Sequence, residues 1–468
     1  MFDKHTYIRR RERLMRTTPN SLLLFVGNDD SPFNYAGNQY RFRQDSTFLY
    51  LFGLDTPALA ATVDTSAGVS TLYADDVSMD DIVWTGPMPS ASERAALCGA
   101  ERSRPRASLA ADIARARAAG QAVLYVAPYR GETALRLSEL LGASPAEVAA
   151  GGSTLLVRGL VELRSAKEQC EIDDMDRQAA FGRAMHLAAM RMAHAGVTEN
   201  EIMARIEMEA LRGGGPVSFP TICTTHGETL HNHGYIHTLE AGRMLLVDAG
   251  CESPAHYATD NTRTTPVGGR FTTRQREIYE IVLAANDHVR REARPGTMYL
   301  DLHQQASGVI LDGLKSLGIV RGDTAQALAH GAAGLFMPHG LGHMLGLDVH
   351  DMENYGEDLV GYDSETGPRR EGLGIGSLRM ARRLREGFCV TDEPGIYFIP
   401  ELIDRWRAAG KCREFIDYDR LETYKDFGGV RIEDDLLITK DGCRIIGDVR
   451  LPSTPDEVEE EALKGLDA

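Results

Sequence analysis

The chain has 468 residues, enough for about two or three domains and at least one large hydrophobic core. Its composition, 43% hydrophobic and 25% charged residues, is that of an ordinary globular protein. A formal net charge of -17 disfavours nucleic acid and anionic membranes as general partners, and we expect neither. No stretch has the roughly 18 consecutive apolar residues that a membrane-spanning helix needs.

The first residues and the cysteines favour a cytoplasmic location. The N-terminus is basic, but its apolar run, 22–26, is too short for the core of a signal peptide. The seven cysteines are scattered, odd in number and free of any C-x-x-C pair. We therefore interpret them as reduced core residues rather than as disulfides or thiolate ligands.

Residues 1–163 are predicted to form an α/β domain. Apolar, strand-like runs such as 20–28 and 121–128 alternate with helical stretches such as 108–120. The aromatic-rich segment 40–54 is interpreted as a packed strand rather than a ligand platform. Nothing in this region gathers His, Cys and carboxylates densely enough to suggest chemistry.

Residues 164–468 are predicted to form a second domain with an internal duplication. A long helical pattern, 166–194, is followed by a helix that starts at the capping box Thr198–Glu201. Another long helix starts at the capping box Thr272–Gln275, and a shorter helix, about 299–317, follows it. Two similar halves would face each other across a shared cleft. Coincidence is the alternative, because the repeats share almost no residue identity.

Two aspartates lie in predicted strands that are close in sequence. Asp248 ends the buried-looking strand RMLLVDAG, and Asp260 lies twelve residues later in the short strand HYATDNTRT. A short connection would bring both carboxylates together, and a carboxylate that ends an apolar strand is costly unless a positive charge meets it. The alternative is that both are turn residues, since aspartate is common beside glycine.

Three histidines, His339, His343 and His350, lie in the glycine-rich stretch 337–351. His339 and His343 are four residues apart, but the glycines around them argue against the helix of an H-E-x-x-H zinc site. The glycines instead permit the backbone to approach a site closely. Taken alone, a histidine flanked by glycines is more often a satisfied hydrogen-bonding group than a ligand.

Two glutamates lie inside apolar, strand-like runs, Glu393 in CVTDEPGIYFI and Glu433 in GGVRIEDDLLI. Alternation along the second strand puts Arg431 and Glu433 on one face and Asp434 on the other. Glu433 is therefore expected to point inward while Asp434 points away.

Asp248, Asp260, Glu393 and Glu433 would together carry four negative charges, which cannot share a dry cleft without compensation. Two divalent cations would neutralise them, and His343 would complete one coordination shell. A set rich in oxygen, with one imidazole and no thiolate, favours Mn, Co or Fe over a structural zinc. A two-metal centre activates water and polarises a carbonyl, which is the chemistry of amide hydrolysis.

The chain resembles the metallopeptidases with the pita-bread fold, and among them the prolidase and aminopeptidase P branch. Five segments, in the order of that branch's catalytic motifs, carry the resemblance: LLVDAG, YATDNTRT, FMPHGLGHMLGLDVHD, TDEPGIYFI and FGGVRIEDDL. FRQDSTFLYLFGL and DIVWTGPMP are similar to the branch's N-terminal domain. The resemblance implies an α/β domain, 1–163, followed by an α+β pita-bread catalytic domain, 164–468, with an internal pseudo-two-fold duplication. It also implies hydrolysis of the Xaa-Pro bond in small proline-containing peptides.

The resemblance implies a centre of two divalent ions, with Mn favoured and Co, Fe or Zn as alternatives. Its ligands are Asp248, Asp260, His343, Glu393 and Glu433. Asp260 and Glu433 would bridge the two ions, and Glu393 would take a proton from the nucleophilic water.

Further residues match positions that serve the substrate. His231 and His350 would contact it around the scissile bond, and His339 would line the same pocket. Tyr397 and Arg431 would assist proton movement and substrate orientation. A bond to proline nitrogen is a tertiary amide, and that nitrogen must gain a proton to leave. His350 is the first candidate to supply it and His231 the second.

Two positions depart from the pattern of the branch. Asp392 precedes Glu393, and Asn261 follows Asp260, where aliphatic residues are usual. On a strand Asp392 would point away from Glu393, which leaves the metal ligands intact. The Asp392 carboxyl would then need a partner or a water of its own.

Within the branch, the choice is between an Xaa-Pro dipeptidase and an aminopeptidase that trims longer peptides with proline second. Segment 400–426 resembles the prolidase insertion rather than the short connection of aminopeptidase P. Arg379 matches an arginine that binds the free carboxylate of a dipeptide, so we favour the dipeptidase. A homodimer is expected from the resemblance.

Three other functions are weaker alternatives. A binding protein that keeps the fold without catalysis is disfavoured because such chains usually lose ligands, and all five are retained here. A methionine aminopeptidase is disfavoured by the large N-terminal domain, and a creatinase-type relative by the intact ligand set.

Overall fold

The structure is a computed structural model that describes residues 1–232, 234–447 and 449–466. The chain forms two compact units, Met1–Arg164 and Ser165–Ala468. Among the described residues, no helix is both long and apolar enough to cross a lipid bilayer.

The first unit is built on a mixed five-stranded sheet with the order β6-β5-β4-β1-β7, in which β1 is antiparallel to β4 and parallel to β7. Its strands are β1 Ser21–Val26, β4 Ala60–Asp64, β5 Val69–Tyr73, β6 Arg102–Arg104 and β7 Ala122–Leu124, with a separate hairpin of β2 Pro32–Tyr35 and β3 Asn38–Gln39. Its helices are α1 Lys4–Thr17, α2 Ser46–Phe52, α3 Met79–Thr85, α4 Ala91–Cys98, α5 Leu109–Ala118, α6 Gly131–Leu141, α7 Pro145–Ala150 and α8 Thr154–Ser165. Leu109 and Ile113 of α5 pack with Leu22 and Leu24 of β1 in its core.

The prediction of a strand over 40–54 is wrong, because Ser46–Phe52 form the helix α2. Asp45 caps this helix by accepting a hydrogen bond from the Phe48 main-chain N–H at 2.9 Å, and Gly53 ends it with a φ of 61°. All residues of α2 are buried, so the helix lacks the polar face that distinguishes a helix from a strand in a sequence.

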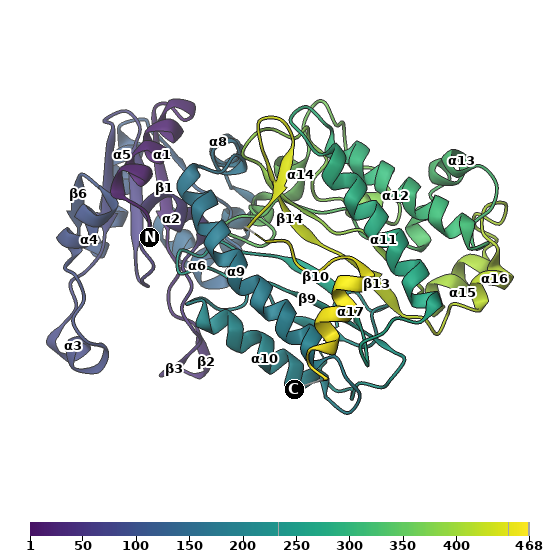
Figure 1. Cartoon of the computed structure of the whole chain (residues 1–468). Coiled ribbons are helices and arrows are strands. Elements are labelled where there is room, and N and C mark those ends of the chain that lie inside the picture. The colour runs from purple at the N-terminus through teal and green to yellow at the C-terminus, as the bar shows by residue number, and fades with distance from the viewer. Residues whose placement is uncertain (233, 448, 467–468) are drawn as a thin grey trace. The chain divides into compact units, whose positions relative to one another are not determined.

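The second unit repeats one plan, a pair of packed helices followed by antiparallel strands (Figure 1). The helix pairs are α9 Gln169–Met192 with α10 Glu199–Arg212, and α11 Thr273–Glu292 with α12 Tyr299–Ser316. α10 and α11 start at the two predicted capping boxes. The shorter helices are α13 Thr324–Ala329, α14 Glu357–Gly361, α15 Pro400–Ala408, α16 Tyr418–Glu422 and α17 Pro455–Leu463. The strands are β8 Ile222–Thr224, β9 Met244–Ala249, β10 Asn261–Pro266, β11 Cys389–Asp392, β12 Gly395–Tyr397, β13 Gly429–Arg431, β14 Asp434–Ile438 and β15 Cys443–Ile445.

The strands of the second unit lie between the two helix pairs (Figure 1). They form two three-stranded sheets, β10-β9-β8 and β11-β14-β15, and the pair β12-β13. Alternation along β9 separates two faces: Leu245 and Val247 pack into a core with α9 and α10, whereas Leu246 packs with Tyr397. Asp248 follows the alternation onto the face of Leu246, toward β12.

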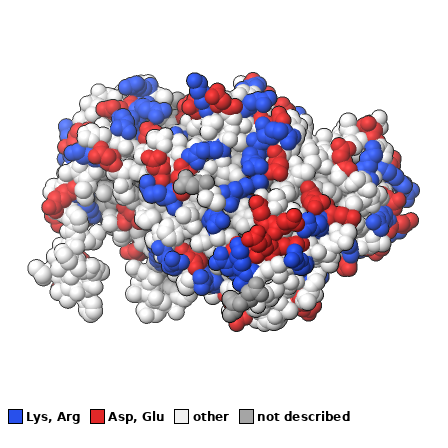
Figure 2. All heavy atoms as spheres, in the orientation of Figure 1, with Lys and Arg blue, Asp and Glu red and all other residues white. Residues whose placement is uncertain are grey.

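Acidic side chains on the face shown in Figure 2 gather over α17, with basic side chains beside them. Arg270 pairs with Glu459 at 2.7 Å, and Arg191 of α9 pairs with Glu461 at 2.5 Å. The arginines of these pairs are exposed, so each pair stabilises the fold by about 0–1 kcal/mol. The acidic excess is thus partly neutralised where it gathers.

Candidate metal centre and substrate cavity

Main-chain pairing between distant strands brings the candidate ligands together. Asp248 lies opposite Thr262 in the hairpin of β9 and β10, and Asp260 directly precedes β10. Thr262 also pairs with Glu433, whose N–H donates to the Thr262 carbonyl at 3.0 Å. Glu433 lies in the break between β13 and β14. Carboxylates from both halves therefore meet at one place.

His343 is fixed by the strand that leads to Glu393. The His343 N–H donates to the Thr391 hydroxyl at 3.1 Å, and its carbonyl accepts from the Thr391 N–H at 3.0 Å. Gly342 permits this approach, because a Cβ there would lie 2.4 Å from the Thr391 carbonyl oxygen. The glycine thus serves close backbone packing beside the site.

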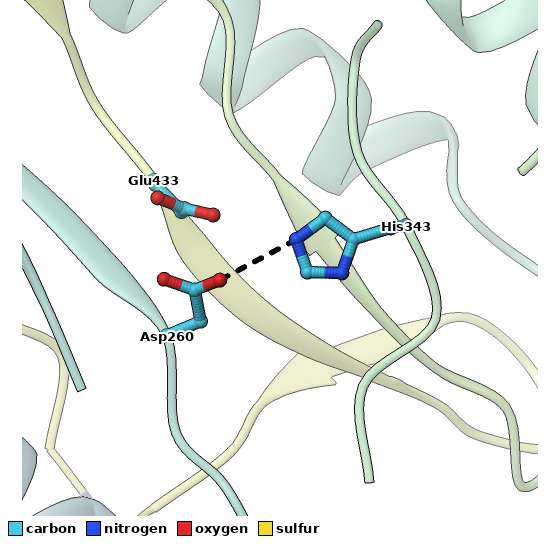
Figure 3. A group of neighbouring side chains, drawn as sticks. All are labelled: Asp260, His343 and Glu433. Carbon is cyan, nitrogen blue, oxygen red and sulfur yellow. Dashed lines mark ion pairs between the residues drawn. The ribbon is translucent and has the colours of Figure 1, made fainter. Parts of the chain in front are cut away.

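Asp260, His343 and Glu433 form a buried group whose ligand atoms all lie within 4.8 Å of one another (Figure 3). His343 Nε2 lies 3.4 Å from Asp260 Oδ2 and 3.7 Å from Glu393 Oε1. Nδ1 of the same ring lies 2.9 Å from the Met344 carbonyl oxygen. Nδ1 therefore carries the proton, and Nε2 presents its lone pair to the carboxylates.

The carboxyl groups of this cluster are buried and repel one another. Burial raises the pKa of Asp260 and of Glu433 well above their ordinary values, and neighbouring carboxylates raise both further. Burial also raises the pKa of Glu393. The atoms Asp248 Oδ1 and Asp260 Oδ1 are buried and accept no hydrogen bond from any residue that the structure describes. Divalent cations would resolve both the repulsion and the unsatisfied oxygens, so this donor set fits a metal centre.

Arg431 holds Asp248 and connects it to Tyr397. Its Nη2 lies 2.5 Å from Asp248 Oδ2, while Nη1 donates to Tyr397 Oη at 2.8 Å. Its Nε donates to Thr262 Oγ1 at 3.0 Å, and the Tyr397 hydroxyl lies 2.9 Å from His339 Nε2. Burial raises the pKa of Tyr397 to about 12, so the phenol keeps its proton at neutral pH.

His350 lies beside His343, with 4.0 Å between the ring centroids. Its Nδ1 donates a hydrogen bond to Glu353. Burial lowers the pKa of His350 to about 4 and that of His339 to about 3. Both rings are therefore neutral at neutral pH and are suited to relay a proton rather than to hold a charge.

One cavity of about 440 Å³ collects the predicted site residues. Those that line it are Asp248, Asp260, His343, Glu393, Glu433, His231, His339, His350, Arg379 and Arg431. Tyr397 contacts the cavity wall through His339 and Arg431. Arg431 and Glu433 both face the cavity, whereas Asp434 pairs with Arg263 at 2.6 Å, so strand alternation predicted these directions.

The apolar wall of the cavity was not predicted. It includes Phe219, Pro220, Ile222, Leu230 and Val349. Phe219 and Pro220 precede β8 and Ile222 opens it, and no ligand-type residue in this short run marks it as part of a site.

The two departures from the family pattern have different surroundings. Asp392 is fully buried, and neither of its side-chain oxygens has a hydrogen-bond partner among the described residues. Burial raises the pKa of Asp392 well above its ordinary value, which favours the neutral acid. Asn261 instead donates to the Glu433 main-chain carbonyl at 3.4 Å, so it supports the segment that carries a candidate ligand.

Two family models match the chain. The model of metallopeptidase family M24 matches residues 173–440, and the model of the aminopeptidase P N-terminal domain matches residues 7–125. An Xaa-Pro dipeptidase of Homo sapiens is 30% identical over 449 residues, which cover 94% of this chain and 88% of the relative.

Solved structures agree with these matches. The aminopeptidase PepP of Pseudomonas aeruginosa is 27% identical, with a TM-score of 0.81 over 100% of this chain and 99% of that chain. A zinc-substituted aminopeptidase P of Escherichia coli in complex with product is 26% identical, with a TM-score of 0.80 over 99% of each chain. The predicted pita-bread fold and the predicted branch are confirmed. The chain therefore belongs to metallopeptidase family M24, and an aminopeptidase P N-terminal domain precedes its catalytic domain.

Proposed function

We propose that the protein hydrolyses the peptide bond before proline in small proline-containing peptides. The observation that carries this proposal is the single cavity that candidate metal ligands share with His231, His339, His350, Arg379 and Arg431. The names of the similar proteins, an Xaa-Pro dipeptidase and aminopeptidases P, support the same substrate class.

Five residues are proposed to hold two divalent cations: Asp248, Asp260, His343, Glu393 and Glu433. When bound, the cations neutralise the buried carboxylates, acidify water and polarise the substrate carbonyl. The oxygen-rich donor set with one imidazole supports Mn over Co, Fe or Zn. The zinc-substituted relative supports a divalent ion at a centre of this kind.

Protons move between three groups in the proposed reaction. Glu393, which lines the cavity beside the other candidate ligands, takes the proton of the attacking water. The proline nitrogen gains a proton as its bond to carbon breaks, because a tertiary amide has no N–H of its own. His350 is the first candidate to relay it, since Glu353 holds its Nδ1 and its ring is neutral. His231 is the second candidate.

The apolar wall of the cavity is proposed to receive the proline ring. Ile222, Leu230 and Val349 offer carbon surface beside the polar groups. A pyrrolidine ring buries apolar area there without leaving a donor unpaired, whereas another residue would bring an amide N–H that needs an acceptor.

The subclass is proposed to be a dipeptidase, with an aminopeptidase as the second candidate. Segment 400–426 forms α15 and α16, and Arg379 lines the cavity, where it is available to a free carboxylate. Two observations favour the aminopeptidase instead. The two similar solved structures named above are aminopeptidases P, and Arg379 already pairs with two glutamates.

Steady-state kinetics with Mn²⁺ on Ala-Pro, Ala-Pro-Ala and Ala-Ala test the proposal. We expect hydrolysis of Ala-Pro, slower hydrolysis of Ala-Pro-Ala, and a rate at least 100-fold lower on Ala-Ala. Hydrolysis of Ala-Pro-Ala alone would assign the aminopeptidase subclass. Failure on both proline peptides, with cleavage of methionyl or creatine-like substrates, would overturn the function.

The protein is further proposed to be a cytoplasmic homodimer. All seven cysteines are free, which fits a reducing compartment. The dimer is supported by the family resemblance. Sedimentation at the 51.3 kDa mass of one chain would contradict it.

A further inference from the structure

Arg379 lies against a pair of acidic side chains at the wall of the cavity. Its Nε is 3.2 Å from Glu353 Oε2 and 3.4 Å from Glu357 Oε1. Glu357 Oε2 is in turn 2.5 Å from Arg369 Nη2. The guanidinium that faces the substrate cavity thus has two carboxylates within ion-pair distance.

Arg379 is the cation most available to a negatively charged group of the substrate. Arg431, which also lines the cavity, is 4% exposed and already bound to Asp248. The Arg379 side chain, by contrast, is 33% exposed. A change in the electrostatic potential at Arg379 therefore changes how strongly the cavity binds a substrate carboxylate.

Glu353 couples Arg379 to His350. Its Oε2 accepts a hydrogen bond from His350 Nδ1 and lies next to Arg379 Nε. That hydrogen bond lowers the pKa of Glu353 to about 2, so Glu353 is charged at neutral pH. Glu353 follows His350 by three residues on a short 3-10 turn, and Glu357 opens α14. One short segment therefore carries both acids.

We propose that Glu353 and Glu357 set how strongly the enzyme prefers a substrate that ends in a free carboxylate directly after proline. Each acid lies close enough to Arg379 to offset the attraction of the guanidinium for such a carboxylate. The two acids thereby allow a peptide with an uncharged group after proline to compete with a peptide that ends in a free carboxylate there. Glu353 is also a positioning residue for His350. This inference rests on the proposed function, because it concerns the group that follows the scissile Xaa-Pro bond.

Two substrates that differ only in this group, Ala-Pro and Ala-Pro-amide, isolate the effect. The quantity measured is the ratio of kcat/KM for Ala-Pro to kcat/KM for Ala-Pro-amide. Glu353→Gln keeps an oxygen that accepts from His350 Nδ1 and removes the charge. Glu357→Gln removes a charge without touching His350. We expect each variant to raise the ratio at least threefold, mainly through a lower KM for Ala-Pro.

Two further variants separate the roles. Asp358→Asn removes an exposed carboxylate that pairs with Arg369 at 3.1 Å, and it should change the ratio less than twofold. Glu353→Ala also removes the acceptor for His350, so kcat should fall on both substrates while the ratio stays raised.

An unchanged or lower ratio in both glutamine variants would overturn the inference. Inhibition constants for proline and prolinamide give the same comparison if turnover becomes too slow to measure. A wild-type protein that cleaves neither substrate would contradict the proposed function instead, so the two failures are distinguishable.

Discussion

Thr262 joins three parts of the candidate metal centre through one hydroxyl. Its Oγ1 donates to Glu433 Oε2 at 2.6 Å and accepts from Arg431 Nε at 3.0 Å, and Arg431 holds Asp248. The residue is fully buried, so water cannot replace either hydrogen bond. Thr262 therefore orients a candidate ligand and an arginine without being a ligand itself.

Replacing Thr262 with valine keeps the branched side chain and removes the hydroxyl. We expect Thr262→Val to lower metal affinity or kcat/KM for Ala-Pro by about 10–100-fold, as the loss of an outer-sphere partner does. Thr265→Val, at another buried threonine of β10, should change both less than twofold. Equal losses in the two variants, measured by metal titration and kinetics, would contradict this role.

The candidate ligands could be predicted from sequence because Glu393 and Glu433 are charged residues inside apolar runs, which is costly unless a cation meets them. Thr262 and Glu353 could not. A threonine in a strand and a glutamate in a polar loop are ordinary at those places. Their importance comes from partners that only the folded chain brings near, and Glu433 is 171 positions from Thr262.

Gly342 determines how closely the segment with His343 approaches β11. Tyr299 Oη donates to the Thr391 carbonyl at 2.5 Å, and a Cβ on residue 342 would lie 2.4 Å from both of these oxygens. A side chain at position 342 would therefore collide with a main-chain oxygen on one side and with the tyrosine hydroxyl on the other. Any side chain at this position must move the His343 segment away from its strand.

Gly342→Ala is expected to destabilise the protein by about 1–3 kcal/mol through overpacking. It should also lower metal content, because His343 moves. Gly308→Ala is the matched control, since a Cβ there, in the middle of α12, would meet no atom of the described residues within 4 Å. It should stabilise by about 0.4–1 kcal/mol. Urea unfolding and metal analysis are carried out on both variants. A Gly342→Ala variant with unchanged stability and metal content would contradict this role of Gly342.

The sequence predicted some elements of the fold and not others for a physical reason. α10 and α11 have capping boxes and polar faces, so their starts could be located. α2 is buried on all sides, so its periodicity carries no information. The breaks after β11 and β13, where Glu393 and Glu433 lie, were also missed, because a continuous apolar run does not reveal where hydrogen bonding to a neighbouring strand stops.

The buried carboxyl cluster links the stability of the whole molecule to pH and metal. For an acid whose pKa is raised by folding, the metal-free folded state binds more protons than the unfolded state. Its stability therefore falls as pH rises above the ordinary pKa near 4, until the folded pKa is passed. Asp260 and Glu433 belong to this class. Burial lowers the pKa of histidines such as His339 and His350. Their contribution makes stability rise with pH, but only below about pH 6.5.

In EDTA, we expect the urea midpoint of the wild type to fall as pH rises above about 6.5, where the histidines no longer contribute. Asp260→Asn should flatten this decline, because it removes one of the two carboxyls and also the repulsion that raises the pKa of Glu433. Adding Mn²⁺ should raise the wild-type Tm by several degrees and abolish the pH slope. A wild-type midpoint in EDTA that is flat or rises with pH would contradict the linkage.

Because Glu433 pairs with Thr262, the candidate metal centre can be completed only late in the synthesis of the chain. Asp248 and Asp260 leave the ribosome long before Glu433, and the 171 positions between Thr262 and Glu433 take roughly 9–34 s at about 5–20 residues per second. During that interval the nascent chain carries between two and four of the five candidate ligands. A chain released early lacks Glu433 and the strand that positions it. If Glu433 is a ligand as proposed, we therefore expect peptidase activity only once nearly the whole polypeptide has been made.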